Sequence, residues 1–371
     1  MPDTSHQEFK TLVAGARSIL VAGPANPNTD VICTAAAWWL YFAKKNKPAE
    51  VVFDGTVHRF AFLPEKIDWI QKLENLNRFK IVLDVSRTQV KQLSYDVRGQ
   101  ALEINIVSDG GVFSAGDVRT EQGDYKYDLV LVLGAVSLEL LGHVFSEHRH
   151  FFHEVPVINI DRSVINENYG QLNIIDAKAT SLAEISYGLM AGELDKNIAT
   201  NLLGGMIAAT NSFQSSQVTP ATLELASQLI VQGANRELII ESLYRTKDIK
   251  TLKNWGRVLS RLSQSEHVIT SFLKHEELEN LPQDFQDLVR DLILANPETQ
   301  VAAIFYQLAL DQTEVWLYTI DNVDALELVR EFNPKGHRRF AQIVLGHTLD
   351  GAKEIILEKL SDKLRIINNT L

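Results

Sequence analysis

Six short aliphatic runs in the first half of the chain most restrict the folds it can adopt. They are rich in Val, Ile and Leu, and several of them are separated by stretches whose apolar residues recur with helical spacing. Such runs are typical of strands buried on both faces of a parallel sheet, with crossover helices between them. We therefore expect strands at residues 17–22, 50–53, 79–83, 102–107, 128–133 and 155–160.

The remaining pattern predicts a second, smaller domain. Helical spacing is found at 31–44, 137–146 and 181–190, and helices dominate from Asn197 to about residue 262. Strands at 300–307 and 315–318 and helices at 323–331 and 351–363 follow. Because 371 residues exceed what one core usually organises, we predict two α/β domains. They are a parallel-sheet N-terminal domain at 1–230 and a smaller α/β C-terminal domain at 265–371, joined by a helical linker at 231–264.

Charge and cysteine content exclude several classes of function. The net charge of −11 opposes the long-range attraction that proteins coating duplex nucleic acid use, so no duplex partner is expected. The single cysteine, Cys33, rules out an internal disulfide and suits a reducing compartment. The polar start of the chain does not read as a signal peptide, and no apolar run approaches the roughly 20 residues that span a bilayer. We expect a cytoplasmic protein without membrane association.

Polar motifs follow several of these strands at their carboxyl ends, where parallel sheets place their binding sites. The loop at 23–30 contains the pair Asn26 and Pro27 and ends at Asp30. The strand at 155–160 is followed by Asp161, Arg162 and a series of glycine, asparagine and threonine residues as far as Glu184. The stretch 203–213 (LGGMIAATNSF) and the stretch 332–337 (FNPKGH) complete the set.

In order and spacing, these motifs resemble those of the DHH phosphoesterase superfamily, over nearly the whole chain. The likeness is greatest to the oligoribonuclease and pAp-phosphatase branch. It implies a DHH-type parallel-sheet domain followed by the DHH-associated C-terminal domain. It also implies a two-metal phosphoesterase site that uses Mn²⁺ or Mg²⁺, with nucleotides or short single-stranded RNA as ligands.

The positions that match the family's metal ligands have mostly changed. Of six such positions, only Asp30 keeps a carboxylate, whereas the other five are occupied by Pro24, Asn28, Gly134, Arg162 and Ala209. The leading Asp of the family's signature survives as Asp161, but its second His is Ser163. One carboxylate cannot neutralise two divalent cations, and a guanidinium adds positive charge beside them. Two-metal catalysis is therefore disfavoured.

Two hypotheses follow from these replacements. The first is a catalytically silent homologue without a cofactor that binds a nucleotide, a short RNA end or a protein partner. Its phosphate-binding residues would be Arg162, Lys335, Gly336, His337, Arg338 and Arg339. The second is an active phosphoesterase whose rebuilt site holds one Mn²⁺ or Mg²⁺ with Asp30, Asp84 and Asp161, and in which Asp30 and Asp161 are catalytic.

Structural roles are open for the same residues. Asp30 is placed to cap the helix that follows it, and Asp161 is placed to bind the turn after a buried strand. The cations at 335–339 have the pattern of a solvated basic face. The sequence leaves the oligomeric state open.

Overall fold

The computed structural model describes residues 3–190, 192–246, 248–275, 277, 288–320 and 322–368. The chain divides into two compact units, Met1–Arg245 and Thr246–Leu371. The helices of the predicted linker are shared between the units, since α8 (Arg236–Tyr244) belongs to the first and α9 (Ile249–Leu259) to the second. The domain limits at 230 and 265 stay predictions.

A six-stranded parallel sheet forms the centre of the first unit. Its strand order is β10-β9-β8-β1-β2-β3, and every neighbouring pair is parallel. This sheet confirms the predicted α/β class. The strands are β1 (Ile19–Ala22), β2 (Ala49–Val52), β3 (Trp69–Ile70), β8 (Leu129–Leu133), β9 (Val157–Asp161) and β10 (Leu172–Ile175).

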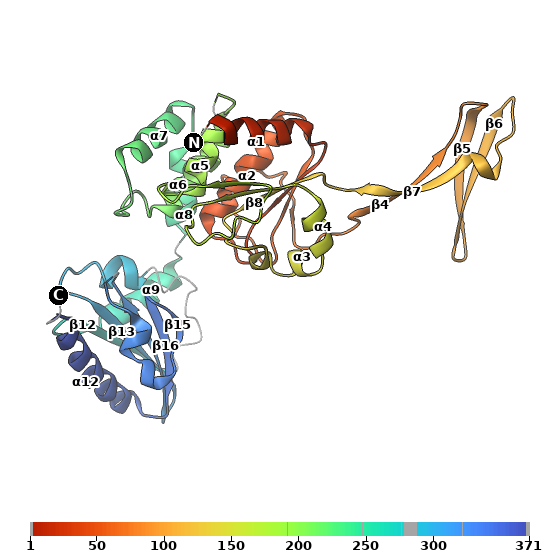
Figure 1. The fold of residues 1–371 in the computed structure, drawn as a ribbon. Coiled ribbons are helices and arrows are strands. Elements are labelled where there is room, and N and C mark those ends of the chain that lie inside the picture. The colour runs from red at the N-terminus through yellow and green to blue at the C-terminus, as the bar shows by residue number, and fades with distance from the viewer. Residues whose placement is uncertain are drawn as a thin grey trace. The chain divides into compact units, whose positions relative to one another are not determined.

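Helices cover both faces of this sheet (Figure 1). Alternate strand residues face opposite ways, so Ile19 and Val21 pack with the helices of one layer while Leu20 and Ala22 pack with those of the other. The first layer contains α1 (Asp3–Gly15), α2 (Thr29–Lys44), α5 (Leu182–Met190) and α6 (Lys196–Ala209), with α7 (Pro220–Val231) and α8 beyond them. The second contains η2 (Leu138–Leu141), α3 (His143–Ser146) and α4 (Arg149–Glu154). The central strands are therefore buried on both faces.

Two of the expected strands do not belong to the parallel sheet. β4 (Asn77–Leu83) pairs antiparallel with β7 (Val118–Tyr125), and β5 (Gln89–Arg98) pairs antiparallel with β6 (Ala101–Asp109). Together with η1 (Ala115–Asp117), these strands form two successive two-stranded ribbons that leave the sheet (Figure 1). We call residues 77–125 the arm. The prediction of parallel strands at 79–83 and 102–107 is wrong, because both runs pair antiparallel within the ribbons; residues 102–106 alternate apolar and polar side chains as one-sided ribbons do.

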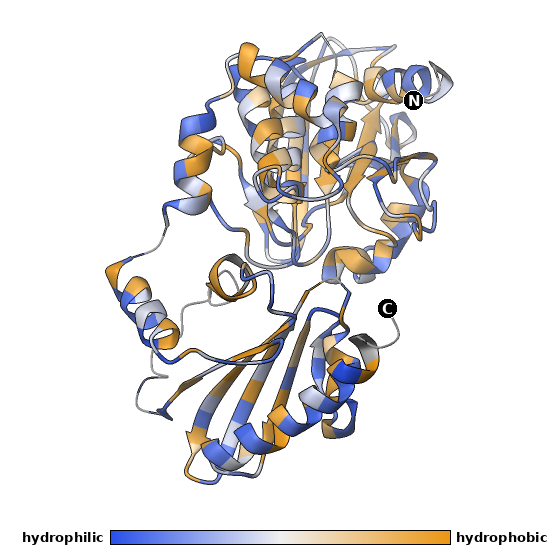
Figure 2. Ribbon diagram, turned by 90° about the vertical axis from the view of Figure 1, so that its left-hand side faces the viewer, coloured by the Kyte–Doolittle hydropathy of each residue, from blue (hydrophilic) through white to orange (hydrophobic). Residues whose placement is uncertain are grey.

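The second unit is a mixed sheet with the order β11-β12-β13-β14-β16-β15. Its helix α12 is buried along one side through Ala352, Ile356 and Leu360, and Figure 2 shows hydrophobic and hydrophilic residues mixed along it. The elements are α9, β11 (Ser263–Ser265), β12 (Val268–Leu273), η4 (Val289–Ile293), β13 (Val301–Ala309), β14 (Gln312–Thr319), α11 (Ala325–Leu328), η5 (Arg330–Phe332), β15 (Lys335–His337), β16 (Phe340–Leu345) and α12 (Leu349–Asn368). Among the described residues, no helix is long and apolar enough to span a bilayer.

Candidate site at the carboxyl ends of the parallel strands

The loop between β1 and α2 brings the first motif to the carboxyl edge of the sheet. Asn28 caps α2, since its side-chain oxygen accepts a hydrogen bond from the backbone N–H of Val31 at 3.0 Å. Asp30 lies inside the first turn of α2 and is 5% exposed. The expectation that Asp30 caps the helix that follows it is therefore wrong, because Asn28 fills that position.

Asp30 instead caps a helix from a distant part of the chain. Its Oδ2 accepts a hydrogen bond from the backbone N–H of Leu182 at 2.8 Å, and its Oδ1 accepts one from the backbone N–H of Ala183 at 3.3 Å. The Thr34 hydroxyl donates a further bond to Oδ1 at 3.2 Å. Leu182 is the first residue of α5, so the carboxylate satisfies N–H groups that have no partner within their own helix.

Burial decides the charge state of this carboxyl group. The loss of hydration raises the pKa of Asp30 from 3.8 to about 6. The hydrogen bonds from Leu182 and Ala183, the positive charge of Arg162 and the bond from Thr34 oppose that rise without cancelling it. A metal ligand needs oxygen lone pairs aimed at the ion, whereas both oxygens of Asp30 already accept hydrogen bonds within the protein.

Asp161 is the last residue of β9, and Arg162 begins the turn that follows. The Oδ1 of Asp161 accepts a hydrogen bond from the backbone N–H of Arg162 at 2.7 Å, and its Oδ2 accepts one from the Asn166 amide at 2.7 Å. The Asp161 side chain is 4% exposed. Arg162 is exposed, and its guanidinium donates to the carbonyl oxygen of Thr180 at 2.9 Å. The carboxylate therefore supports the turn that presents the guanidinium.

An asparagine network extends this turn into the sheet. Asn166, which is 7% exposed, also donates to the carbonyl oxygen of Ala135 at 3.0 Å. Its Oδ1 accepts a bond from the buried Asn159 at 2.7 Å, and Asn159 donates to Asn173 as well at 3.0 Å. The sequence motif contained these asparagines, but nothing in their spacing indicated that they bind one another.

Three further positions that match the family's ligands carry no side-chain donor for a metal. They are occupied by Pro24, Gly134 and Ala209. Gly134 has a φ of +65°, and a Cβ there would lie 2.8 Å from the Leu182 side chain, so a larger residue would not fit without rearrangement. Among the described residues, no three His, Cys, Asp or Glu side chains gather as a possible metal site. The donors present do not fit a pair of divalent ions.

Asp84 lies in the arm and not at the edge of the parallel sheet. It follows β4, its backbone N–H donates to the carbonyl oxygen of Asp117 at 2.8 Å, and its side chain is exposed. Hydrogen bonds from Ser86 hold the pKa of Asp84 below its ordinary value. The prediction that Asp84 ends a strand of the parallel sheet is wrong. Metal binding by Asp30, Asp84 and Asp161 together stays a prediction without geometric support.

The basic residues of the second unit lie on and beside an edge strand. Lys335, Gly336 and His337 form β15, and Arg338 and Arg339 form the turn into β16; all five are exposed. Gly336 has a φ of +138°, and a Cβ there would lie 2.1 Å from the carbonyl oxygen of Phe340. Glycine is therefore required by the tight hairpin, whatever the strand binds.

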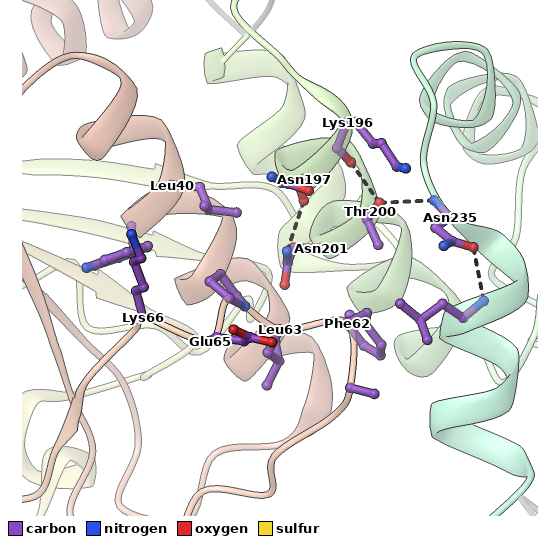
Figure 3. A pocket seen from close by; sticks show the side chains of 14 residues that line it. Leu40, Phe62, Leu63, Glu65, Lys66, Lys196, Asn197, Thr200, Asn201 and Asn235 are labelled. Atoms are coloured by element: carbon purple, nitrogen blue, oxygen red, sulfur yellow. Dashed lines mark hydrogen bonds between the residues drawn. The ribbon is translucent and has the colours of Figure 1, made fainter.

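The first unit also contains a pocket of about 470 Å³ between α2, the segment after β2, α6 and α8 (Figure 3). None of the motif residues discussed above lines it. The Asn201 side chain, which is 1% exposed, donates to the carbonyl oxygen of Asn197 at 2.9 Å. Its own oxygen has no hydrogen-bond partner among the described residues. The pocket is lined by Trp39, Leu40, Ala61, Phe62, Leu63, Pro64, Glu65, Lys66, Lys196, Asn197, Thr200, Asn201, Asn235 and Leu238.

Comparison with known proteins agrees with the motifs and the fold. The chain is 26% identical over 215 residues to the bifunctional oligoribonuclease and PAP phosphatase NrnA of Thermus thermophilus. That match covers 56% of this chain and 64% of the relative, which is less than two thirds of the relative's length. This chain is also 31% identical over 107 residues to an uncharacterised protein of Mycoplasma pneumoniae. That match covers 28% of this chain and 33% of the Mycoplasma protein. No family model matches the sequence.

The crystal structure of an exopolyphosphatase-related protein from Bacteroides fragilis has a similar fold. Its TM-score is 0.69, with 15% identity and coverage of 98% of both chains. At this identity the likeness concerns the fold alone. The sequence match to the Thermus protein and the order of the motifs along the chain add to that likeness. In the order of its motifs, in its fold and in the part of its sequence that matches the Thermus protein, the chain is therefore similar to the DHH phosphoesterase superfamily.

Proposed function

We propose that this chain is a catalytically silent DHH homologue that binds a phosphate-bearing ligand, a nucleotide or the end of a short single-stranded RNA, without cleaving it. The ligand's phosphate lies at the carboxyl ends of the parallel strands, and Arg162 is its principal anchor. The observation that carries this proposal is the state of Asp30. It is the one carboxylate left among the six family positions, and it is buried and hydrogen-bonded to α5.

The electrostatics of the strand ends support binding over hydrolysis. A metal-dependent phosphoesterase needs several anionic or imidazole donors around its ions, and here the positions offer a guanidinium, an amide, and three side chains without donors. Five of the six positions lack the anionic or imidazole donors of a metal site, and Arg162 adds a positive charge at one of them. A guanidinium forms charge-assisted hydrogen bonds to phosphate oxygens, and it cannot supply a nucleophile.

The class of ligand rests on the relative. The name of the Thermus protein gives it an oligoribonuclease activity and a PAP phosphatase activity, so we propose a short oligoribonucleotide or PAP as the class of ligand. The same class fits a chain whose net charge of −11 disfavours long polyanions but permits a short one held by a local cation. In the second unit taken by itself, Lys335, His337, Arg338 and Arg339 are exposed side chains that we assign to phosphate binding.

A paired assay of hydrolysis and binding tests the proposal. The full chain is incubated with Mn²⁺ and either pAp or a 5′-phosphorylated diribonucleotide, and product release is measured. Binding of the labelled dinucleotide is then measured in EDTA by equilibrium titration. We expect no Mn²⁺-dependent product and saturable binding that Arg162→Gln weakens about tenfold, as expected for the loss of one charge-assisted contact.

Arg149→Gln is the matched control. This exposed arginine lies in α4, which precedes β9 and so lies toward the opposite edge of the sheet. The control should bind like the original chain. Mn²⁺-dependent turnover that Asp30→Ala abolishes would overturn the silent assignment in favour of an active phosphoesterase with a rebuilt site. Absence of dinucleotide binding, or equal binding by the Arg162→Gln variant, would overturn the assignment of the ligand and its anchor.

A further inference from the structure

The outer ribbon of the arm has one apolar face and one polar face. Register pairs Leu93 with Ile106, Tyr95 with Ile104 and Val97 with Leu102. Because side chains alternate along a strand, these six residues share one face of the ribbon. The pairs between them, such as Ser94 with Asn105 and Asp96 with Glu103, put polar groups on the other face.

The apolar face is open to solvent. The exposed fractions are 63% for Leu93, 73% for Tyr95, 65% for Val97, 59% for Leu102 and 39% for Ile104. In the part of the chain that the structure describes, β5 and β6 pair only with each other, and every residue of β5 is exposed. The inner ribbon continues the pattern, with Phe79, Ile81 and Val118 exposed by 73%, 48% and 43%.

A ribbon of this kind is not expected to be stable alone. A two-stranded hairpin is at best marginally stable in water, and a stable sheet needs further strands or a packed face. Contiguous exposed apolar surface of this extent generally marks an interface. The alternation over residues 93–97 and 102–106 is the pattern of a half-buried sheet, and among the described residues nothing covers the apolar half.

We propose that the apolar face of the β5/β6 ribbon packs against the same face of a second copy of this chain. In this two-fold arrangement the two ribbons lie face to face and form a small four-stranded sandwich, with Tyr95 and its neighbours in the shared core. The apolar face of each copy covers the apolar face of the other. An interface that uses one patch twice closes as a dimer and covers this apolar face in both copies.

The surface available for such a dimer reaches the standard size when the inner ribbon next to the β5/β6 face contributes as well. Burial of a large apolar side chain contributes about 1.5–3 kcal/mol of free energy, and burial of apolar surface contributes about 25 cal/mol per Å². Each such side chain therefore buries roughly 60–120 Å². The five exposed side chains of the β5/β6 face would supply roughly 300–600 Å² per copy, and the adjoining Phe79, Ile81 and Val118 of the inner ribbon would extend this to roughly 500–950 Å². A stable interface of standard size needs about 800 Å² per partner.

The charges around the face favour a second copy over nucleic acid. β5 and β6 carry Lys91 and Arg98 together with Asp96, Glu103 and Asp109, so both signs are present and two copies need not repel each other. Arg98 already bonds Asp96 at 3.1 Å within the ribbon. A nucleic-acid surface would instead show an excess of cations.

Engineered cysteines test the geometry directly. Cys33 is buried and is the only cysteine of the chain, so an added thiol reports on its own position. Under mild oxidation we expect Tyr95→Cys to give a covalent dimer in high yield, because the two faces meet at this residue. Ser94→Cys, the adjacent residue on the polar face, is the matched control and should remain largely uncrosslinked.

Solution mass measures the association itself. We expect the full chain to sediment as a dimer at micromolar concentration. The triple variant Leu93→Ser, Tyr95→Ser, Val97→Ser should sediment as a monomer, whereas Gln92→Ala with Asn105→Ala on the polar face should remain a dimer. Circular dichroism checks that each variant is folded. The proposal would be overturned by a monomeric wild type, by a dimeric triple variant or by equal crosslinking at positions 94 and 95. A monomeric wild type would indicate that the apolar face binds a different protein.

Discussion

The carboxylate Oδ2 of Asp30 accepts a hydrogen bond from the backbone N–H of Leu182, 152 residues further along the chain, at 2.8 Å. This bond joins the loop after β1 to the start of α5. A side chain at a position that the family resemblance would assign to a metal ligand here caps a helix. Gly205 of α6 lies against the same carboxylate, since a Cβ there would be 2.9 Å from Asp30 Oδ1. The Asp30 carboxylate is thus enclosed by α5 and α6 and has a structural role.

The buried acid should make stability depend on pH. The folded pKa of Asp30 is about 6 and its reference value is 3.8, so the folded state holds a proton that the unfolded state has lost between these values. The stability that the protonated carboxyl group of Asp30 contributes to the folded state is fully present below about pH 4 and is lost as pH rises through 6. Relative to Asp30→Asn, the wild-type free energy of unfolding should fall by up to about 3 kcal/mol between pH 4 and 7. Urea titrations at several pH values measure this difference, and a flat or rising difference would contradict it.

Divalent metal should have little effect on the stability of this chain. A ligand that binds only the folded state raises the midpoint of thermal unfolding, and Asp30 has no carboxylate oxygen free of hydrogen bonds. We expect EDTA and excess Mn²⁺ to give midpoints within about 1 °C of each other. We also expect less than about one tenth of an equivalent of bound metal after desalting. A Mn²⁺-dependent rise that Asp30→Ala removes would restore the hypothesis of a rebuilt metal site.

Loss of the Asn166 amide should weaken the turn that carries Arg162. Asn166→Ala removes its hydrogen bonds to Asp161 and Ala135 and leaves a buried carboxylate oxygen without that donor. A buried unsatisfied polar group costs about 1–3 kcal/mol, so the free energy of unfolding should fall by that amount. Val164→Ala, in the same loop at an 81% exposed side chain, is the control and should change it by less than about 0.5 kcal/mol. Equal effects of the two variants would show that the network has no energetic role.

The hairpin of the basic strand should not tolerate a side chain at Gly336. In Gly336→Ala the new Cβ would meet the carbonyl oxygen of Phe340 at 2.1 Å, at a φ of +138°. Relief requires the β15/β16 turn to rearrange, so we expect a loss of roughly 2–4 kcal/mol. Gly346→Ala, where a Cβ has no heavy atom within 4 Å in its surroundings, is the matched control in the same unit. Thermal unfolding of both variants gives the comparison, and similar midpoints would contradict the steric argument.

Local pattern was enough to predict the parallel strands that carry the site. β1, β8 and β9 are continuous aliphatic runs, and the polar motifs follow them directly, so both the fold class and the edge that bears Asp30, Asp161 and Arg162 were predictable. The runs at 79–83 and 102–107 were misassigned because they were judged by aliphatic content. In the second run, the alternation of Leu102, Glu103 and Ile104 is the available signal for a one-sided ribbon, whereas residues 79–83 carry no such signal.

The sequence by itself determined the aliphatic strands β1, β8 and β9, the α/β class and the residue types at the positions compared with the family's metal ligands, because each of these depends on the type and local order of residues. Only the tertiary structure decided which helix Asp30 caps, that Asp84 lies in the arm, and that the apolar face of the arm is uncovered. These outcomes depend on pairing between residues far apart in the chain. The same pairing removes water from Asp30, so the pKa of this carboxyl group is also a property of the folded chain.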